Sequence, residues 1–243
     1  MPKILIATPT ADTLEPQTSG WREEIAHRYR DHIKFADIND LPTIGIGRPV
    51  DYVRNCLIRK FRAADFTHLF FLDSDTEPPL DCIERLLSLN VPLATGCYPV
   101  IMQQGLRWAL SNRAAAPPGL LSQESRGGYR LLEWLPFFDK PFEVDAGGAG
   151  CLLIRRDVFD KVHWPWFKWV EFEDGSQESE DIFFFRKCND AGLRLMADPQ
   201  IICNHFKKTN ITDLMRMKML SPRRGQESMT GKVVLKSQIE NRN

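Results

Sequence analysis

Short apolar segments recur along the chain and predict the strands of a sheet. Two of them contain the continuous runs Leu-Phe-Phe-Leu and Cys-Leu-Leu-Ile, and an unbroken apolar run is typical of a strand that is covered on both faces. The predicted strands lie at Ile4–Ala7, His68–Leu72, Val91–Gly96, Cys151–Ile154, Leu193–Ala197 and Ile201–Cys203.

Helical periodicity lies between these strands. From Pro49 to Ala64, apolar residues recur at steps of three and four positions, and a shorter stripe runs from Leu80 to Leu87. A third helix is predicted over Glu180–Ala191, with Gly192 placed to end it. The alternation of strands and helices over the first hundred residues predicts an α/β fold with a mostly parallel, Rossmann-type sheet flanked by helices.

Composition changes this picture little. The chain has 243 residues, of which 43% are hydrophobic and 26% are charged, which is typical of a soluble globular domain. We expect one catalytic domain over residues 1–220, a mobile loop over 111–128, where Ala, Pro, Gly and Ser accumulate, and a flexible tail over 221–243. The whole chain is neutral, but Phe206–Asn243 carries nine Lys or Arg against three Asp or Glu.

Several classes of protein are disfavoured by what the sequence lacks. No apolar run reaches 18 residues, so no membrane-spanning helix is expected, and the first apolar run is too short for a signal peptide. The six cysteines include no Cys-x-x-Cys pair, which favours reduced, buried thiols over a zinc site or a disulfide framework. We therefore expect a cytoplasmic protein, with peripheral membrane association through the basic tail left open.

The segment Asp73-Ser74-Asp75 carries the clearest chemical signal. It follows a buried strand directly, and in open α/β sheets ligands bind outside the carboxyl ends of strands. Two carboxylates at such a position reach one hard divalent cation, which keeps coordination positions for phosphate oxygens. The alternative is an ordinary turn in which Asp forms local hydrogen bonds.

This context resembles the Asp-x-Asp motif of GT-A-fold glycosyltransferases, especially the family-2-like group common in bacteria, phages and large viruses. In that family the motif binds Mn²⁺ or Mg²⁺, which holds the diphosphate of a nucleotide-sugar. The resemblance runs from about Ile4 to Lys208. It implies that Asp73 and Ser74 contact the donor, and that Asp73, Asp75 and His205 hold the metal, since imidazole with carboxylates suits Mn²⁺.

Other segments match the family's pattern in the same order. The resemblance implies further donor-binding residues, which are Thr8, Pro9, Thr10, Arg54, Asn55, Asp145, Gly147, Gly148, Lys207 and Lys208. In the family the loop after the first strand holds the base and ribose, and a small-residue loop lets the sugar approach the backbone, where glycine offers no obstruction. The two lysines would contact the diphosphate. Each residue also has a plain structural reading as a turn, a bulge or a surface side chain.

The pair Glu180-Asp181 matches the family's carboxylates at a helix start, one of which acts as the base. A carboxylate within hydrogen-bond reach of a sugar hydroxyl makes that hydroxyl a better nucleophile. Asp181 is favoured over Glu180 as the base, and clustering with Glu178 is expected to raise the pKa of one member. The alternative role is favourable charge at the start of a helix.

Together these features imply an enzyme, a metal-dependent glycosyltransferase that moves a sugar from a UDP- or GDP-sugar to an acceptor hydroxyl with inversion. The acceptor stays open among a glycan, a lipid-linked sugar, a protein and a modified nucleic-acid base, and the oligomeric state is not predicted. One alternative is a haloacid-dehalogenase-like phosphatase using Asp73 and Asp75, although Glu77 stands where that motif has Thr or Val. A non-catalytic nucleotide-sugar or glycan-binding module is the other alternative.

Overall fold

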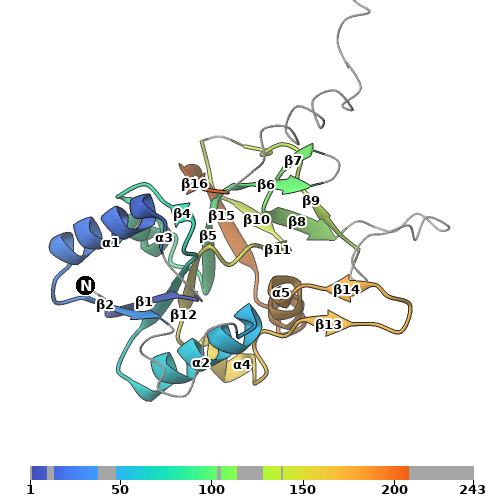
Figure 1. The fold of residues 1–243 in the computed structure, drawn as a ribbon, viewed down its shortest axis with the longest axis horizontal. Helices are drawn as coiled ribbons and strands as arrows, with labels where there is room; N and C mark the ends of the chain where they lie inside the picture. The colour runs from blue at the N-terminus through green and yellow to red at the C-terminus, as the bar shows by residue number, and fades with distance from the viewer. Residues whose placement is uncertain are drawn as a thin grey trace, which may run out of the picture. The chain divides into compact units, whose positions relative to one another are not determined.

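A seven-stranded sheet forms the centre of the part of the chain that the computed structural model describes, residues 2–9, 14–37, 48–102, 105–113, 128–137 and 139–207 (Figure 1). The sheet has the order β10-β15-β5-β12-β3-β1-β2. Its strands are β1 (Ile4–Thr8), β2 (Ile33–Asp37), β3 (His68–Leu72), β5 (Leu93–Cys97), β10 (Phe142–Val144), β12 (Cys151–Arg155) and β15 (Leu195–Ile202).

Five of the seven strands run in the same direction. Strands β2, β1 and β3 are parallel neighbours, as are β5 and β15, while β12 runs antiparallel between β3 and β5 and β10 runs antiparallel to β15. This arrangement confirms the predicted α/β class with a mostly parallel sheet. The apolar run of β12 correctly predicted a strand buried on both faces, but that pattern carries no information on strand direction.

Helices cover both faces of the sheet. Along β3, Leu69 and Phe71 face a core built with α2 (Val50–Ala63), α4 (Val158–Lys161) and α5 (Glu180–Asp190). Phe70 and Leu72 face a second core built with α1 (Pro16–Arg28) and α3 (Cys82–Ser88). The unbroken Leu-Phe-Phe-Leu run therefore supplies both cores at once, and the carboxyl end of β3 emerges between the two layers.

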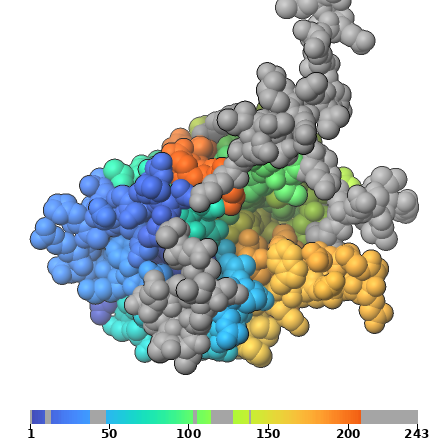
Figure 2. All heavy atoms as spheres, viewed as in Figure 1, coloured from blue at the N-terminus to red at the C-terminus, as the bar shows by residue number. Residues whose placement is uncertain are grey.

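Smaller strands surround the carboxyl end of the sheet. Strands β4 (Thr76–Glu77) and β16 (Asn204–His205) form one ribbon, β6 (Pro99–Met102) pairs with β7 (Gly105–Trp108), and β8 (Leu110–Arg113), β9 (Tyr129–Leu131) and β11 (Ala146–Gly147) form a small sheet. Strands β13 (Val170–Glu171) and β14 (Gln177–Glu178) form a hairpin that projects from the surface (Figure 2). Its exposed end carries the carboxylates of Glu173 and Asp174.

The elements differ from the predicted ones in a few places. The two predicted strands at 193–197 and 201–203 form the single strand β15, α3 begins at Cys82 rather than Leu80, and the start of the predicted loop, Ser111–Arg113, belongs to β8. Gly192 follows α5 with a φ of +72°, which fits its predicted role in ending that helix.

Parts of the predicted organisation lie outside the described residues. These are Thr10, Lys208, the rest of the predicted loop (114–127) and the predicted tail (221–243). The described residues belong to one compact unit, except Met102 and Gly105. Across the described ranges, no helix combines the length and apolar character needed to cross a membrane.

Candidate functional site

The ribbon of β4 and β16 brings His205 to the Asp73-Ser74-Asp75 segment. The chain leaves β3 through these three residues and enters β4, where Thr76 pairs with His205 of β16 in an antiparallel register. The Phe206 N–H then donates a hydrogen bond to the Asp75 carbonyl oxygen at 2.8 Å. Two segments that are far apart in sequence thus meet at the carboxyl end of β3, where the sequence predicted a site.

Asp75 is held between two basic groups. Its Oδ1 lies 3.6 Å from His205 Nε2, and Lys207 donates a hydrogen bond from Nζ to its Oδ2. Burial on its own would raise the pKa of Asp75, but the hydrogen bonds and charges of His205 and Lys207 outweigh it and lower this pKa to about 2. Asp75 is therefore ionised at any physiological pH.

The imidazole of His205 has a defined orientation. Its Nδ1 lies 2.7 Å from the Pro99 carbonyl oxygen, which only accepts, so Nδ1 donates this hydrogen bond. Nε2 faces Asp75 Oδ1 at 3.6 Å. A histidine that binds a metal commonly donates its other N–H to a backbone carbonyl in this way.

Arg54 of α2 connects the two groups of carboxylates. Its Nη2 donates to Asp73 Oδ1 at 3.0 Å, and its Nε lies 3.7 Å from Glu180 Oε1. The residue is only 2% exposed, and its guanidinium carbon lies 5.2 and 5.5 Å from the ring centroids of Phe71 and Phe167. The sequence predicted a contact between Arg54 and the nucleotide, whereas the structure uses this side chain to join Asp73 to Glu180.

Glu180 and Asp181 occupy the first turn of α5. Ser179 already caps this helix, since its Oγ accepts from the Ile182 N–H at 3.4 Å, so the two carboxylates are not needed as caps. Burial first, and then the charge of Glu180, raise the pKa of Asp181 to about 8, while Arg54 opposes the rise. Burial also raises the pKa of Glu180, again against the effect of Arg54. Asp181 therefore holds a proton at neutral pH.

The expected contribution of Glu178 to this raised pKa is wrong. Glu178 lies on β14, and both of its carboxylate oxygens accept hydrogen bonds from Arg186 at 2.9 Å. Its charge is therefore neutralised by a two-point pair. The repulsion that raises the pKa of Asp181 comes from its neighbour Glu180 instead.

A short segment that we call the glycine loop, Gly148–Gly150, lies against both groups of carboxylates, the Asp73-Ser74-Asp75 segment and the Glu180-Asp181 pair. The Asp73 N–H donates to the Gly150 carbonyl oxygen at 3.1 Å, and Arg54 Nη1 donates to the Ala149 carbonyl oxygen at 3.4 Å. The Ala149 backbone also opposes the rise in the pKa of Asp181. A Cβ atom at Gly150 would lie 2.9 Å from Asp73 Oδ2, so glycine is required here because the protein's own carboxylate approaches the backbone.

Tyr98 is a part of this site that the sequence analysis missed. Its hydroxyl accepts a hydrogen bond from the Gly150 N–H at 3.1 Å, and its ring packs edge-on against His205 with centroids 5.0 Å apart. The available signal was its position, directly after a predicted strand of a parallel sheet, where binding residues gather.

Asn55 has a structural role. Its Nδ2 donates to the carbonyl oxygens of Asp51 and Phe167 at 2.8 and 2.6 Å, and its Oδ1 accepts from the N–H groups of Trp166 and Phe167 at 3.1 and 3.2 Å. These contacts use both donors and both lone pairs of the amide. We therefore do not retain Asn55 as a nucleotide ligand.

Asp145 and Gly147 are also engaged within the fold. Asp145 Oδ2 accepts from the Arg113 N–H at 2.7 Å, and its Oδ1 lies 3.6 Å from Arg194 Nη1. Gly147 belongs to β11, and a Cβ there would lie 3.1 Å from a methyl carbon of Leu195. Their predicted contacts with a sugar gain no support from these positions.

Several buried polar atoms at this edge of the sheet have no hydrogen-bond partner among the described residues. They are Thr8 Oγ1, Arg54 Nε, Thr76 Oγ1 and Asp181 Oδ1. Thr8 ends β1 beside β3, with Pro9 following it, and the Ser74 carbonyl oxygen accepts from the Glu15 N–H at 2.9 Å. Buried groups left unpaired at one place indicate that water or a polar ligand completes the site.

The predicted metal ligands are brought together only in part. Asp75 and His205 are neighbours, whereas Asp73 is paired with Arg54. Within the described ranges, no three His, Cys, Asp or Glu side chains form a group that could hold a metal ion. Of the three predicted metal ligands, the structure thus brings together only Asp75 and His205.

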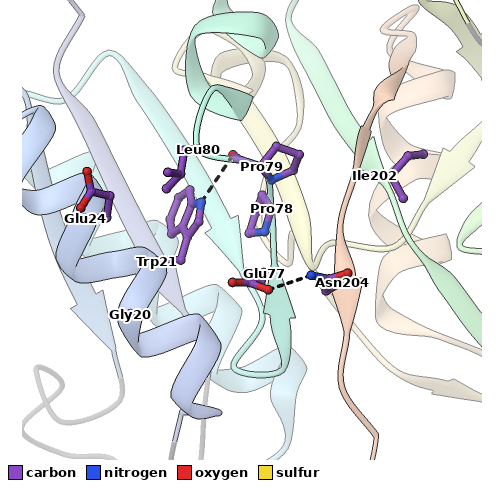
Figure 3. A pocket seen from close by; sticks show the side chains of 9 residues that line it. All are labelled: Gly20, Trp21, Glu24, Glu77, Pro78, Pro79, Leu80, Ile202 and Asn204. Carbon is purple, nitrogen blue, oxygen red and sulfur yellow. Dashed lines mark hydrogen bonds between the residues drawn. The ribbon is translucent and has the colours of Figure 1, made fainter.

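A groove lies on the other side of the β4–β16 ribbon (Figure 3). It has a volume of about 470 Å³ and is lined by Trp21, Pro79, Leu80 and Ile202 together with Glu77 and Asn204, which hydrogen-bond to each other at 2.8 Å. Since Glu77 and Asn204 alternate with Thr76 and His205 along their strands, they face away from the site.

Comparison with known proteins establishes the fold. No family model and no curated protein matches the sequence. Among solved structures, A197 from STIV aligns with a TM-score of 0.55 and 18% identity over 85% of this chain and 86% of that chain. The structure of GalNAc-T7 with UDP, GalNAc and Mn²⁺ aligns with a TM-score of 0.50 and 13% identity over 86% of this chain but only 38% of that chain. The likeness to these two structures shows that the α/β fold described above is GT-A-like.

Proposed function

We propose that the protein is a glycosyltransferase that moves a sugar from a nucleotide-sugar, a UDP- or GDP-sugar, to an acceptor hydroxyl with the help of Mn²⁺ or Mg²⁺. The observation that carries this proposal is the pairing of Arg54 with both Asp73 and Glu180. This pairing makes the Asp73-Ser74-Asp75 segment and the carboxylates of α5 one polar site at the carboxyl edge of a GT-A-like sheet. The UDP, GalNAc and Mn²⁺ in the GalNAc-T7 structure support the choice of donor class and metal.

The residues present fit a divalent cation. Asp75 is ionised, and His205 Nε2 lies 3.6 Å from its Oδ1. A site with one carboxylate and one imidazole leaves most coordination positions for diphosphate oxygens and water, as in many nucleotide-dependent sites. When bound, the cation would supply positive charge that stabilises the departing diphosphate. Lys207, which already contacts Asp75, adds a second positive charge beside the same group.

Asp181 is the base in the proposed reaction. Its carboxylate takes the proton of the acceptor hydroxyl while that oxygen forms a bond to the anomeric carbon. The bond between this carbon and the diphosphate oxygen breaks, and the diphosphate leaves with the electron pair. Attack on the side opposite the leaving group inverts the anomeric carbon. Because the pKa of Asp181 is raised to about 8, only the ionised fraction of the protein carries out this step at neutral pH, and turnover should rise as the pH approaches 8.

Two observations disfavour the phosphatase alternative. Asp73 would be its nucleophile, yet Asp73 Oδ1 is paired with the buried Arg54, and the strand before it is the third of the chain rather than the first. The non-catalytic binding module differs from our proposal only in turnover, so an assay separates the two.

A thermal-shift panel tests the proposal. UDP, GDP and ADP are added with and without Mn²⁺ to the wild type, to Asp75→Ala, and to the control Asp65→Ala, whose carboxylate is 91% exposed and pairs only with Lys3 among the described side chains. A ligand at 100 times its Kd stabilises the native state by about 2.7 kcal/mol, or roughly 5–10 °C for a chain of this size. We expect one nucleotide to raise the melting temperature by this amount only when Mn²⁺ is present. Asp75→Ala should lose this shift, and Asp65→Ala should keep it.

No shift with any nucleotide would contradict the proposed donor class. If a nucleotide binds, release of free nucleoside diphosphate from the matching nucleotide-sugar is measured next. Release by the wild type and its loss in Asp181→Asn indicate a transferase, whereas binding without release indicates a non-catalytic module.

A further inference from the structure

Tyr98 and Pro99 lie between the two halves of the candidate site. They follow β5, and each contacts a different part of the site. The Tyr98 hydroxyl meets the glycine loop, while the Tyr98 ring and the Pro99 carbonyl oxygen both meet His205.

The contact with the glycine loop is specific. The Tyr98 hydroxyl accepts from the Gly150 N–H at 3.1 Å, and a Cβ atom on Gly148 would overlap that hydroxyl. The loop therefore accommodates Tyr98 only because Gly148 has no side chain. The same loop accepts hydrogen bonds from the Asp73 backbone N–H and from Arg54 Nη1, so its position bears on the Asp73 backbone and on the Arg54 side chain.

The contact with His205 fixes the direction of the imidazole. The two rings meet edge-on at an angle of 71°, and the Pro99 carbonyl oxygen accepts from Nδ1 at 2.7 Å. Together these contacts leave Nε2 no direction other than toward Asp75, 3.6 Å away. Tyr98 is itself only 5% exposed, so the ring has little freedom to move.

We propose that Tyr98 is a positioning residue that holds the glycine loop and His205 in a fixed relation to each other. Through the loop it positions Asp73 and Arg54, and through its ring it positions the imidazole beside Asp75. The positioning itself follows from the contacts alone, and its consequence for turnover rests on the proposed glycosyltransferase function.

Two variants separate the two contacts. Tyr98→Phe removes only the hydroxyl and retains the ring against His205, whereas Tyr98→Leu removes both. The control is Tyr129→Phe, which removes the hydroxyl of another buried tyrosine. That hydroxyl accepts hydrogen bonds from Arg113 Nε at 3.1 Å and from Asn189 Nδ2 at 3.3 Å. All variants are made in the full chain and measured first without metal or nucleotide.

The first readout is hydrogen exchange of the Gly150 amide, and the second is the ¹⁵N signal of the His205 ring. We expect Tyr98→Phe to accelerate Gly150 exchange about tenfold, as loss of one hydrogen bond allows, and to leave the His205 signals in place. Tyr98→Leu should also shift the ring nitrogens. Unchanged Gly150 exchange in Tyr98→Phe, or a change no larger than in Tyr129→Phe, would overturn the proposal. Because Tyr98→Phe is conservative, it decides the question even if Tyr98→Leu does not fold.

Turnover gives a third readout that a purely structural role would not produce. In Tyr98→Phe we expect kcat to fall about 10- to 100-fold, the size of effect seen when a group that orients a ligand is removed. KM for the donor should change by less than about threefold, because Asp75 and His205 keep their places. A wild type that binds no nucleotide would refute the proposed function, yet the exchange and ring-nitrogen results would still decide the role of Tyr98.

Discussion

Replacing Asp181 by Asn should stabilise the protein at high pH while it removes turnover. Asn has nearly the same shape as Asp but does not titrate. The native state of the wild type holds the Asp181 proton up to a pH of about 8, because burial and Glu180 raise this pKa, whereas the unfolded state loses it near 3.8. The native state therefore binds more protons throughout this window, and stability falls as the pH rises through it.

The size of the effect follows from the width of that window. Between pH 6 and pH 8 the wild type loses about 2 kcal/mol of stability through Asp181, since one pH unit below the pKa corresponds to 1.36 kcal/mol and the slope declines as the pKa is reached. For a chain of this size this equals roughly 5–10 °C in melting temperature. The Asn variant lacks this loss, so its advantage over the wild type should grow by that amount between the two pH values.

The assay is thermal unfolding of both proteins from pH 5 to pH 9, with Asp157→Asn as the control. Asp157 pairs with Arg155 at the surface, which lowers its pKa, so its variant should show no growing advantage above pH 6. Turnover of Asp181→Asn should fall by a factor of about 100 or more, as expected when a general base is lost. A constant difference in melting temperature across this range would refute the raised pKa, and normal turnover would refute the base.

Three further substitutions test the roles that the structure assigns. Asn55→Ala should lower the free energy of unfolding in urea by about 2–4 kcal/mol, because buried backbone groups lose partners, while the nucleotide Kd measured by calorimetry stays unchanged. Arg54→Met should lower the free energy of unfolding by about 3–5 kcal/mol at pH 7. The loss should be smaller at pH 5, where the carboxylates left without their cation take up protons more readily. Gly148→Ala should lower the melting temperature, because its Cβ overlaps the Tyr98 hydroxyl, whereas Gly20→Ala in α1, with open space around it, should raise it slightly.

Strands and helices were predictable where burial leaves a strong periodic signal. Strand β3 matches its predicted bounds, His68–Leu72, because every residue from Leu69 to Leu72 is buried. Helix α1 was missed because only Thr18, Trp21 and Ile25 of its thirteen residues are buried, which leaves little periodicity to detect. Strand β2 is short and partly exposed, and it gave an equally weak signal.

The candidate site was predictable in its location but not in its contacts. Carboxylates at a strand end predict a binding edge, and Asp75, His205, Glu180 and Asp181 do lie there. The direction in which an amide or a guanidinium points depends on segments far away in sequence. One example is the backbone of Trp166 and Phe167, whose N–H groups donate hydrogen bonds to the Asn55 side chain. Spacing could not show that Arg54 would be buried between two carboxylates, nor that Arg186 would neutralise Glu178.

The most direct test of the proposed function is anomalous diffraction from a crystal grown with Mn²⁺ and UDP. We predict one manganese peak within coordination distance of Asp75 and His205 Nε2, with diphosphate oxygens completing the coordination and Lys207 beside them. The same crystal of Asp75→Ala should show no peak at that place. A manganese ion bound elsewhere in the wild type, or UDP bound away from the carboxyl end of β3, would contradict the proposed site.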